Sequence, residues 1–461
     1  MLRDFATSTV QTLRQRGFQA YLVGGCVRDL LLGREPADYD VASNATPEQV
    51  MSIFPEAYAV GAQFGVVLVP VPRRDVARGV PTDAASKSRT VEVATFRSDI
   101  GYSDGRHPDE VRFSQDPRED VARRDFTING LLLDLVSGEV LDFVGGRKDL
   151  DAGIVRTIGD PELRFAEDKL RMLRAVRFAA RFEYSIEPAT FRAMQAMADQ
   201  IQVVSRERVR EELTHMLTEG HARRAFLLLD ESGLLARVLP EIFAMKGVAQ
   251  PPDFHPEGDV FAHTLLLLEN LPRACPLTLA WGALLHDVGK PPTFRVADRI
   301  RFDNHVEVGV KMAEEICQRL RFSNDDTAQI VSLVENHMRF SHATRMSAST
   351  LRRFLRMPRF DEHLALHRAD CLASHGDLST YEFVMQKREE IPPQNMRPAP
   401  LVTGDDLIAA GHIPGPKFRE ILNAVEDAQL EGRLTSRDAA LEFVRRKFPV
   451  ERFPNPALPV D

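Results

Sequence analysis

Two successive patterns along the chain restrict its fold more than any other feature. Between about residues 20 and 145, short apolar runs such as AYLVGG, FGVVLVPV and RTVEVATFR alternate with helical stretches such as TPEQVMSIF. From about residue 160 onward, long amphipathic helical patterns dominate and convincing strand alternation disappears. Because the period of the apolar pattern differs between strands and helices, the sequence predicts an α/β unit followed by a helical half.

Turn-rich and proline-rich stretches divide the chain further. The best boundary inside the helical half is VAQPPDFHPEGD, and REEIPPQNMRPAPLVTGDD separates a last module. RRDVARGVPTDAASKSR is polar and indicates a loop, whereas SDIGYSDGRHPDEVRF is rich in turn residues and is a candidate lid. We predict domains at 1–150, 151–254, 255–385 and 386–461.

The composition is typical of a globular chain. The 461 residues are 44% hydrophobic and 27% charged, and the first stretch, MLRDFATSTVQTLRQRGFQ, lacks an apolar core long enough for a signal peptide or a membrane span. We therefore expect a cytoplasmic protein without a membrane partner. The cysteines lie far apart and indicate neither a disulfide framework nor a zinc ribbon, so we interpret them as small buried residues: Cys26, Cys275, Cys317 and Cys371.

A pair of glycines follows the first apolar run. The strand pattern that ends at Val23 runs directly into Gly24 and Gly25. A strand that breaks at glycines and restarts as a helix presents backbone N–H groups, and helix N-termini favour anions. The turn is therefore a candidate phosphate cradle, with an ordinary turn as the alternative.

Two aspartates follow, one residue apart. In a strand, Asp38 and Asp40 point to the same side and Tyr39 to the other. Adjacent carboxylates repel unless a cation lies between them, and oxygen ligands at this spacing suit Mg²⁺. Metal-assisted phosphoryl transfer uses such a pair, and an exposed turn is the alternative.

One basic patch stands out although the net charge of −8 argues against a uniformly basic nucleic-acid coat. In EDKLRMLRAVRFAARF, Arg171, Arg174, Arg177 and Arg181 recur every three or four residues, so they lie on one side of a helix. This face fits contact with nucleic acid, and a solvated basic face is the alternative.

These motifs occur together and in a definite order. With Gly25, Arg28, Asp38 and Asp40 followed by RRDFTING and EDKLRMLRAVRFAARF, residues 20 to 240 resemble the bacterial class II tRNA nucleotidyltransferases. These are the CCA-adding enzymes and their poly(A) polymerase relatives within the DNA polymerase β superfamily. The resemblance implies an α+β fold, in which a polymerase β-like nucleotidyltransferase head with a mixed sheet precedes an all-helical neck, body and tail.

The resemblance also implies roles for the residues of the head. Gly25 and Arg28 are expected against the triphosphate, and Asp38 and Asp40 are expected to bind Mg²⁺. Glu92 in TVEVATFR stands where polymerase β relatives carry a third catalytic carboxylate.

A phosphate-contacting arginine is implied in RRDFTING. Arg124 matches that position of the family, and Arg123 lies beside it. A helix-start salt bridge between Arg124 and Asp125 is the alternative.

Base choice is predicted to depend on EDKLR. Asp168 and Arg171 are three residues apart on a predicted helix, so they share a face and can address one flat partner. Cytosine and adenine both offer an amine beside a ring-nitrogen acceptor, so this pair accepts both and rejects guanine and uracil. The resemblance gives these positions the same templating role, and Arg174 is a further expected nucleotide-binding residue. A surface salt bridge between Asp168 and Arg171 is the alternative.

Two further segments favour one activity within the family. TFRSDIGYSDGRHPDEV matches the flexible loop that the resemblance links to the switch from C to A addition, and GAQFG at 61–65 lacks the basic GRRF-like stretch of poly(A) polymerases. We predict template-independent addition of C, C and A to tRNA 3′ ends from CTP and ATP by two-metal nucleotidyl transfer. A poly(A) polymerase and an enzyme confined to CC or A addition are alternatives. An HD phosphohydrolase with an RNA-binding head is the alternative from another class.

A second set of motifs lies between residues 255 and 375, where ALLHDVGK, NHVEVG, ENHMRF and HRADCLA follow FAHTLLLLENL. They resemble an HD-domain phosphohydrolase, and Lys290 also fits that signature, although a charged helix end explains it equally well. The resemblance implies one or two metals and hydrolysis of phosphate esters such as the 2′,3′-cyclic or 2′-phosphate ends of tRNA. Imidazole with carboxylate suits Mn²⁺, Ni²⁺ or a similar metal, and Mg²⁺ is the other option. A single histidine is more often a packing residue than a metal ligand. The residues that match the metal-binding positions of the HD domain are His263, His286, Asp287, His305, His337 and Asp370.

Overall fold

The computed structural model describes residues 2–60, 65–71, 90–102, 105, 108–251, 258–392 and 396–450. They form two compact units, Met1–Lys246 with Arg319–Arg321, and Gly247–Gln318 with Phe322–Asp461. The predicted division into four domains stays a prediction. Most of the GAQFG motif, the loop at 73–89, and parts of the candidate lid and of the VAQPPDFHPEGD boundary lie outside the described residues.

A seven-stranded sheet forms the head of the first unit. Its strand order is β3-β4-β5-β2-β1-β8-β9, and β2 pairs with β5 in parallel whereas the other neighbours are antiparallel. The sheet is therefore mixed, and the predicted α+β class is confirmed. The strands are β1 (Ala20–Val23), β2 (Asp40–Ser43), β3 (Tyr58–Ala59), β4 (Val66–Pro70), β5 (Thr90–Thr95), β8 (Leu131–Leu133) and β9 (Val140–Asp142).

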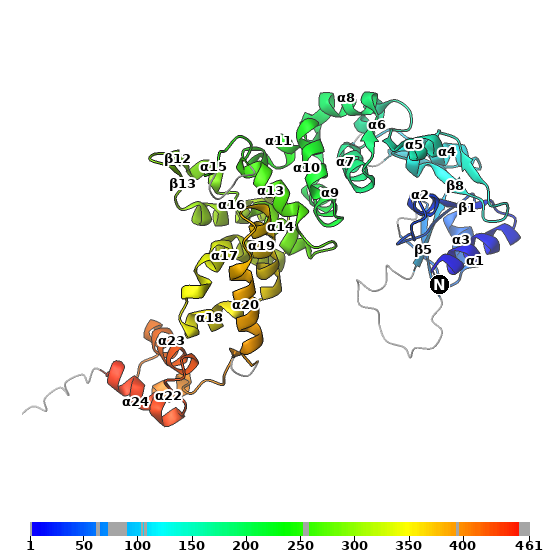
Figure 1. Cartoon of the computed structure of the whole chain (residues 1–461). Helices are drawn as coiled ribbons and strands as arrows, with labels where there is room; N and C mark the ends of the chain where they lie inside the picture. The colour runs from blue at the N-terminus through cyan, green and yellow to red at the C-terminus, as the bar shows by residue number, and fades with distance from the viewer. Residues whose placement is uncertain are drawn as a thin grey trace, which may run out of the picture. The chain divides into compact units, whose positions relative to one another are not determined.

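Helices α1 (Leu2–Gln15) and α3 (Pro47–Ile53) pack against this sheet (Figure 1). Along α1, Ala6, Val10 and Leu13 recur at helical spacing and are fully buried, so the helix turns its apolar stripe toward the strands. The head is completed by α2 (Gly25–Leu31), the hairpin of β6 (Arg97–Ile100) and β7 (Glu110–Phe113), α4 (Pro117–Ala122), η3 (Thr127–Asn129) and α5 (Gly146–Ala152).

Helix α7 (Leu170–Phe182) is central to the helical part of the first unit. It contacts α9 and α10, and its Phe178 ring meets the Phe126 ring edge to face with centroids 5.8 Å apart. Because Phe126 is fully buried, this contact joins the helices and the head in one core. The surrounding elements are β10 (Ile154–Val155), α6 (Pro161–Glu167), β11 (Ser185–Ile186), α8 (Pro188–Met197), η4 (Ala198–Val203), α9 (Arg206–Thr218), α10 (Ala222–Glu231), α11 (Leu235–Val238) and α12 (Pro240–Phe243).

Helix α14 (Leu277–Leu285) is the buried centre of the second unit. Its residues from Thr278 to Leu285 are all buried, as expected for a helix enclosed by others. It contacts α13 and α19, which carry His263 and Asp370, and α17, which His337 follows directly. The other elements are α13 (Val260–Glu269), α15 (Lys290–Thr293), β12 (Phe294–Val296), β13 (Ile300–Phe302), α16 (His305–Arg319), α17 (Asn324–Asn336), η5 (His337–Arg345), α18 (Ala348–Leu355), α19 (Phe360–Ala373), α20 (Ser379–Glu390), α22 (Gly404–Ala409), α23 (Pro416–Leu430) and α24 (Arg437–Lys447).

The antiparallel hairpin of β12 and β13 interrupts these helices. The expectation that strands are absent beyond residue 160 is wrong at this point. Each strand has only three residues, too few for a two-residue period to stand out beside helical patterns. The hairpin ends three residues before His305, the first residue of α16, so it leads the chain into that helix.

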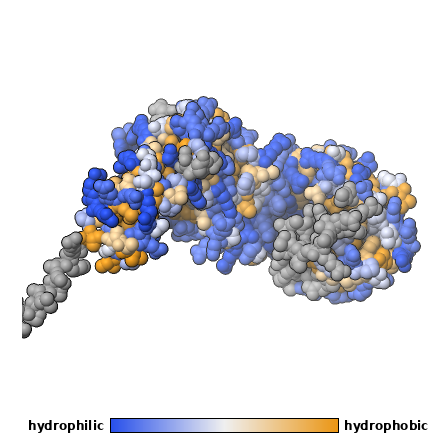
Figure 2. Space-filling model, turned by 90° about the horizontal axis from the view of Figure 1, so that it is seen from below, coloured by the Kyte–Doolittle hydropathy of each residue, from blue (hydrophilic) through white to orange (hydrophobic). Residues whose placement is uncertain are grey.

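The surface is mostly hydrophilic on the face in Figure 2, where hydrophobic side chains gather in small separate patches. Scattered apolar residues of this kind are ordinary on protein surfaces. Within the described ranges, no helix combines the length and the apolar character needed to cross a bilayer.

Gly282 allows α14 and α17 to approach closely. A Cβ atom at this position would lie 2.5 Å from Leu333 Cδ1 and 2.8 Å from its Cβ. We expect Gly282→Ala to lower the free energy of unfolding of the second unit by about 1–3 kcal/mol, because the two helices must move apart. Urea unfolding followed by the fluorescence of Trp281, the chain's single tryptophan, measures this change.

Gly415→Ala is the matched control for that measurement. Its backbone is extended, and among the described residues a Cβ there would meet nothing within 4 Å. Equal unfolding midpoints for the two variants would contradict the packing argument.

Candidate functional site

A cavity of about 840 Å³ opens in the first unit and brings the predicted head and neck residues together. It is lined by every residue that the sequence analysis assigned to nucleotide or magnesium binding there, apart from Glu92: Gly25, Arg28, Asp38, Asp40, Arg124, Asp168, Arg171 and Arg174.

Asp38 and Asp40 line the sheet end of this cavity, and Glu92 lies close enough to interact electrostatically with both of them. Asp40 is the first residue of β2 and lies opposite Glu92 in the parallel pairing of β2 with β5. Burial and the charges of Glu92 and Asp38 together raise the pKa of Asp40 to about 7, against the opposing charge of Arg124. Burial likewise raises the pKa of Glu92. The charge of Arg124 opposes this rise, and the charge of Asp38 adds to it. The prediction that Asp38 lies within the strand is wrong, because β2 begins at Asp40 and Asp38 sits in an exposed bend before it.

The donor set at this end of the cavity fits Mg²⁺. All three groups offer oxygen, the donor that Mg²⁺ prefers. Burial and, after it, the repulsion by Glu92 and Asp38 raise the pKa of Asp40, and a cation among the three groups relieves this repulsion.

The glycine turn and Arg28 form the wall beside the carboxylates. Gly24 has φ +76°, and a Cβ atom on it would lie 3.2 Å from Arg124 Nη1, so the turn requires glycine. Arg28 on α2 is buried; its Nε donates to Asp29 Oδ1 at 2.8 Å and its Nη1 to Asn129 Oδ1 at 2.7 Å. These contacts fix the direction of the guanidinium at the cavity.

Arg123 and Arg124 are both held by Asp120, a residue that the sequence analysis missed. Asp120 is fully buried; its Oδ1 lies 2.7 Å from Arg123 Nη2 and its Oδ2 lies 2.9 Å from Arg124 Nη2. Burial opposes ionisation of Asp120, but the two arginines outweigh it and lower its pKa. Asp120 lies on α4, three and four residues before the arginine pair that follows this helix, and this spacing is the signal that marks it.

The alternative partner proposed for Arg124, Asp125, is engaged elsewhere. Its Oδ2 accepts from Arg174 Nη2 at 2.6 Å, and its Oδ1 accepts from Asn129 Nδ2 at 3.1 Å. Arg124 forms its ion pair with Asp120, and its guanidinium lies at the cavity wall rather than in a helix-start bridge to Asp125.

The segment predicted to read the base departs from the expected helix. Helix α6 ends at Glu167 and α7 begins at Leu170, so Asp168 lies in the break, with φ −146°. The premise that Asp168 and Arg171 share a helix face is therefore wrong, and so is the alternative of a salt bridge between them. Both side chains nevertheless line the same cavity.

Asp168 and Arg171 each bond to partners of their own. Arg208 on α9 grips Asp168 with both terminal nitrogens, Nη1 to Oδ1 at 3.1 Å and Nη2 to Oδ2 at 2.6 Å. Arg171 Nη1 lies 2.6 Å from Glu167 Oε2, and its Nη2 donates to the Arg123 carbonyl at 3.2 Å. The sequence analysis missed Arg208, which lies 40 residues from Asp168 and outside the quoted motif.

The arginine face of α7 is paired with acidic residues rather than solvated. Arg177 Nε lies 2.7 Å from Glu212 Oε2, and Arg181 Nη1 lies 3.6 Å from Glu219 Oε1. Only part of its positive charge is thus available to a nucleic acid.

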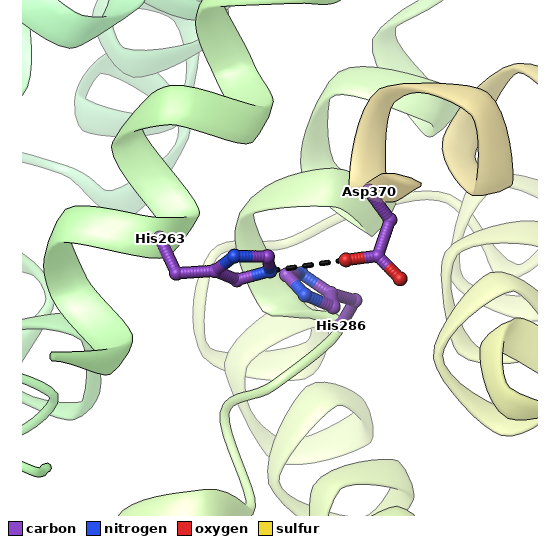
Figure 3. A group of neighbouring side chains, drawn as sticks. All are labelled: His263, His286 and Asp370. Atoms are coloured by element: carbon purple, nitrogen blue, oxygen red, sulfur yellow. Dashed lines mark ion pairs between the residues drawn. The ribbon is translucent and has the colours of Figure 1, made fainter. Parts of the chain in front are cut away.

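In the second unit, the six predicted HD residues converge. They form two groups whose ligand atoms lie within 4.8 Å of one another, His263 with His286 and Asp370, and Asp287 with His305 and His337. Figure 3 shows the first group, in which His263 Nε2 lies 3.0 Å from Asp370 Oδ1. Adjacent His286 and Asp287 belong to different groups, so the motif links both.

Backbone carbonyls orient the imidazoles. Nδ1 of His286, His305 and His337 lies 2.8, 2.9 and 2.7 Å from the carbonyls of Ala283, Phe302 and Val334. A proton on Nδ1 makes each of these bonds, which leaves the lone pair on Nε2 to face the centre. The buried Nε2 atoms of His305 and His337 have no hydrogen-bond partner among the described residues.

The charge states at this centre also fit a metal. Burial lowers the pKa of His337 to about 4, so its imidazole is neutral at neutral pH, the form that binds metal. Burial opposes ionisation of Asp287, yet His286 and Lys290 hold its pKa well below the ordinary value. Two imidazole-and-carboxylate groups suit a divalent transition metal, one to each group.

Gly289 sets the distance between the HD motif and α16. A Cβ atom on it would lie 2.0 Å from the His305 carbonyl oxygen. Only glycine permits this approach of the two backbones, which brings His305 to Asp287, with His305 Nε2 3.9 Å from Asp287 Oδ1.

The fold and the first cavity define a nucleotidyltransferase head joined to helices, with an HD centre in the second unit. Family models match at three places: the poly A polymerase head domain at 20–156, the probable RNA and SrmB-binding site of polymerase A at 183–246, and the HD domain at 259–374.

Two curated relatives are named for CCA addition. The CCA-adding enzyme of Geobacillus stearothermophilus is 41% identical over 231 residues, which is 50% of this chain and 53% of that protein. The multifunctional CCA protein of Chromobacterium violaceum is 36% identical over 348 residues, which is 73% of this chain and 79% of that protein. The chain thus matches only about half the length of several relatives, the first of these two included.

A solved structure matches nearly the whole chain. The crystal structure of the Bacillus stearothermophilus CCA-adding enzyme in complex with CTP aligns with a TM-score of 0.73 at 27% identity, covering 96% of this chain and 97% of that one. The Thermotoga maritima CCA-adding enzyme complexed with tRNA aligns at 0.57 and 18% identity, covers 96% of this chain and 94% of that one, and supports the fold. The chain belongs to the bacterial class II tRNA nucleotidyltransferases of the poly(A) polymerase family, with an HD domain.

The ion pair of Asp125 makes the stability of the first unit depend on acid pH. Burial opposes ionisation, but Arg174 and the hydrogen bonds from Asn129 and the Phe126 N–H lower the pKa of Asp125 to about 2. A carboxyl whose pKa is lowered by folding stabilises the protein fully at pH values above its ordinary pKa. This contribution is lost as the pH falls from about 4 toward 2. We expect Asp125→Asn to lower the free energy of unfolding by about 2 kcal/mol at pH 6. At pH 3 the loss should be smaller, about 1 kcal/mol.

Urea titrations of wild type and variant at the two pH values measure this difference. Asp151→Asn serves as the control, since Asp151 is an exposed aspartate of the same unit. If wild type and Asp125→Asn differ in free energy of unfolding by as much at pH 3 as at pH 6, the lowered pKa of Asp125 is contradicted.

Proposed function

We propose that the protein adds C, C and A to the 3′ end of tRNA, using CTP and ATP and no nucleic-acid template. The observation that carries this proposal is that Asp38 and Asp40 share one cavity with the base-reading candidates Asp168 and Arg171. The names of the relatives and the CTP complex of the similar crystal structure support it.

In this reaction the tRNA 3′ oxygen bonds to the α-phosphorus of the nucleotide, the bond to pyrophosphate breaks, and the hydroxyl gives up its proton. Asp38, Asp40 and Glu92 would hold Mg²⁺, which when bound supplies Lewis-acid activation of the reacting oxygens. Arg28 and Arg124 would contact the triphosphate, and their partners keep both guanidinium groups in place before it arrives.

Base choice is proposed to rest on Asp168 and Arg171. The carboxylate would accept from the amine of cytosine or adenine, and the guanidinium would donate to the neighbouring ring nitrogen. Arg208 and the Leu170 N–H both donate to Asp168 Oδ1, whereas Oδ2 accepts only from Arg208 among the described residues and keeps a lone pair for the base. Arg174, which is held by Asp125, would complete the nucleotide site.

The rival activities within the family are poly(A) synthesis and addition confined to CC or A. Purified protein is given tRNA transcripts that lack CCA, end in CC or end in CCA, with each nucleotide alone and in mixture. Extension that stops at CCA supports the proposal, and an unlimited A tail overturns it. A hydrolase with a merely RNA-binding head is disfavoured, because such a head has no use for two carboxylates that repel Asp40.

For the second unit we propose a metal-dependent phosphohydrolase acting on phosphate-ester ends of RNA. The observation behind it is the pair of ligand groups joined by His286 and Asp287. Water would bond to phosphorus, the ester P–O bond would break, and the leaving oxygen would take a proton. Mn²⁺, Ni²⁺ or Mg²⁺ would be held by the six side chains.

The two activities are expected to separate by mutation. Asp40→Asn should abolish nucleotide addition, at least a thousandfold, while tRNA affinity stays within about twofold, because phosphate contacts by arginine and lysine supply most of that affinity. The measurements are incorporation of labelled CTP and filter binding of tRNA.

The reciprocal control is the double variant His286→Ala with Asp287→Ala. It should lose hydrolysis of 2′,3′-cyclic AMP and adenosine 2′-monophosphate and keep CCA addition. Retained addition by Asp40→Asn would contradict the head assignment, and retained hydrolysis by the double variant would contradict the HD assignment.

Asp168→Ala is expected to lose about 1–3 kcal/mol of discrimination against UTP and GTP, the usual scale of a bidentate base contact. Competing incorporation of the four nucleotides measures it. Glu162→Ala, an exposed change on the preceding helix, is the control. If Asp168→Ala keeps wild-type selectivity, the base is read by other groups.

A further inference from the structure

Lys290 is a buried cation on the wall of the HD cavity, a space of about 440 Å³. Its Nζ lies 2.7 Å from Asp287 Oδ2 and donates to Gln250 Oε1 at 2.6 Å. An ammonium group has three N–H donors, so these contacts leave one for a group in the cavity.

Neutralising Asp287 does not account for this lysine. Asp287 Oδ1 lies 3.7 Å from His337 Nε2 and belongs to a candidate metal group, so a bound metal would neutralise this carboxylate. Once one divalent metal is bound, the two carboxylates of the centre are balanced, and the charge of Lys290 is in excess. A buried excess charge is unfavourable unless an ion of opposite sign joins it. The centre therefore calls for an anion.

Gln250 fixes the direction of Lys290. Its side chain is buried, its Oε1 accepts from the lysine, and its Nε2 has no hydrogen-bond partner among the described residues. A buried amide costs free energy unless it is used, so a hydrocarbon would be the better residue if packing were its only role. The ring of Phe302 lies beneath the ammonium, with Nζ 5.3 Å from its centroid, and lines the same cavity.

We propose that Lys290 binds a phosphate oxygen of a terminal nucleotide, and that Gln250 is the positioning residue that aims it. The cavity is larger than a phosphate alone requires, and Phe302 and Met338 on its wall suit the ribose and base. This inference rests on the proposed hydrolase function and names the group that holds its substrate.

The test uses the full chain loaded with Mn²⁺ and titrated calorimetrically with adenosine 2′-monophosphate and, separately, with inorganic phosphate. Lys290→Gln should weaken both by about tenfold or more, the scale of a lost charged hydrogen bond, with the bound manganese per chain unchanged. Lys290→Arg keeps the charge and should recover part of the affinity. Gln250→Met should weaken the binding of both probes by about threefold, because Lys290 keeps its charge but loses the hydrogen bond that orients it.

Gln329→Met is the matched control, a buried glutamine that bonds to Glu362 and does not line the cavity. Unchanged probe affinity in Lys290→Gln, with hydrolysis intact, would overturn the inference and leave the hydrolase standing. Loss of manganese in Lys290→Gln, with Gln250→Met at wild-type affinity, would show that the lysine acts through Asp287 and also overturn it. A wild type that binds manganese but hydrolyses no phosphate ester would overturn the proposed hydrolase instead.

Discussion

The pairing of buried charges is the constraint on which both sites depend. The side chains of Asp120 and Asp287 are 0% and 3% exposed, and each faces more than one cationic or imidazole partner. A buried carboxylate without such partners would take up a proton rather than stay charged. The elements that carry the partners must therefore meet, and their meeting builds the cavity walls.

The two centres use this constraint in opposite ways. In the second unit the carboxylates are already compensated, and the pKa of Asp287 lies well below its ordinary value. In the head, burial and the charges of Glu92 and Asp38 raise the pKa of Asp40 to about 7, so a cation there would stabilise its charged form. Around that gap, Arg28 and Arg124 are held by partners of their own, which reduces the entropy lost when they bind a ligand.

Much of the architecture could be predicted from the sequence because the helices and strands follow from the local spacing of apolar residues. The alternation up to residue 145 indicated the sheet, the helical period indicated the remainder, and adjacent His286 and Asp287 with distant histidines indicated the metal groups. Where the local pattern was too short, as in the hairpin at Phe294–Phe302, the prediction failed. It also failed at Asp168, because a helix pattern continues through the break between α6 and α7.

The sequence by itself determined which chemical groups the protein carries, in what order, and to which family they belong. Only the tertiary structure decided which of these groups face one another. The parallel pairing of β2 with β5 sets Glu92 opposite Asp40, Arg208 reaches Asp168 across 40 residues, and Gln250 reaches Lys290 across 40. Such contacts arise from sheet register and helix packing between remote segments, where no local periodicity carries information about the partner.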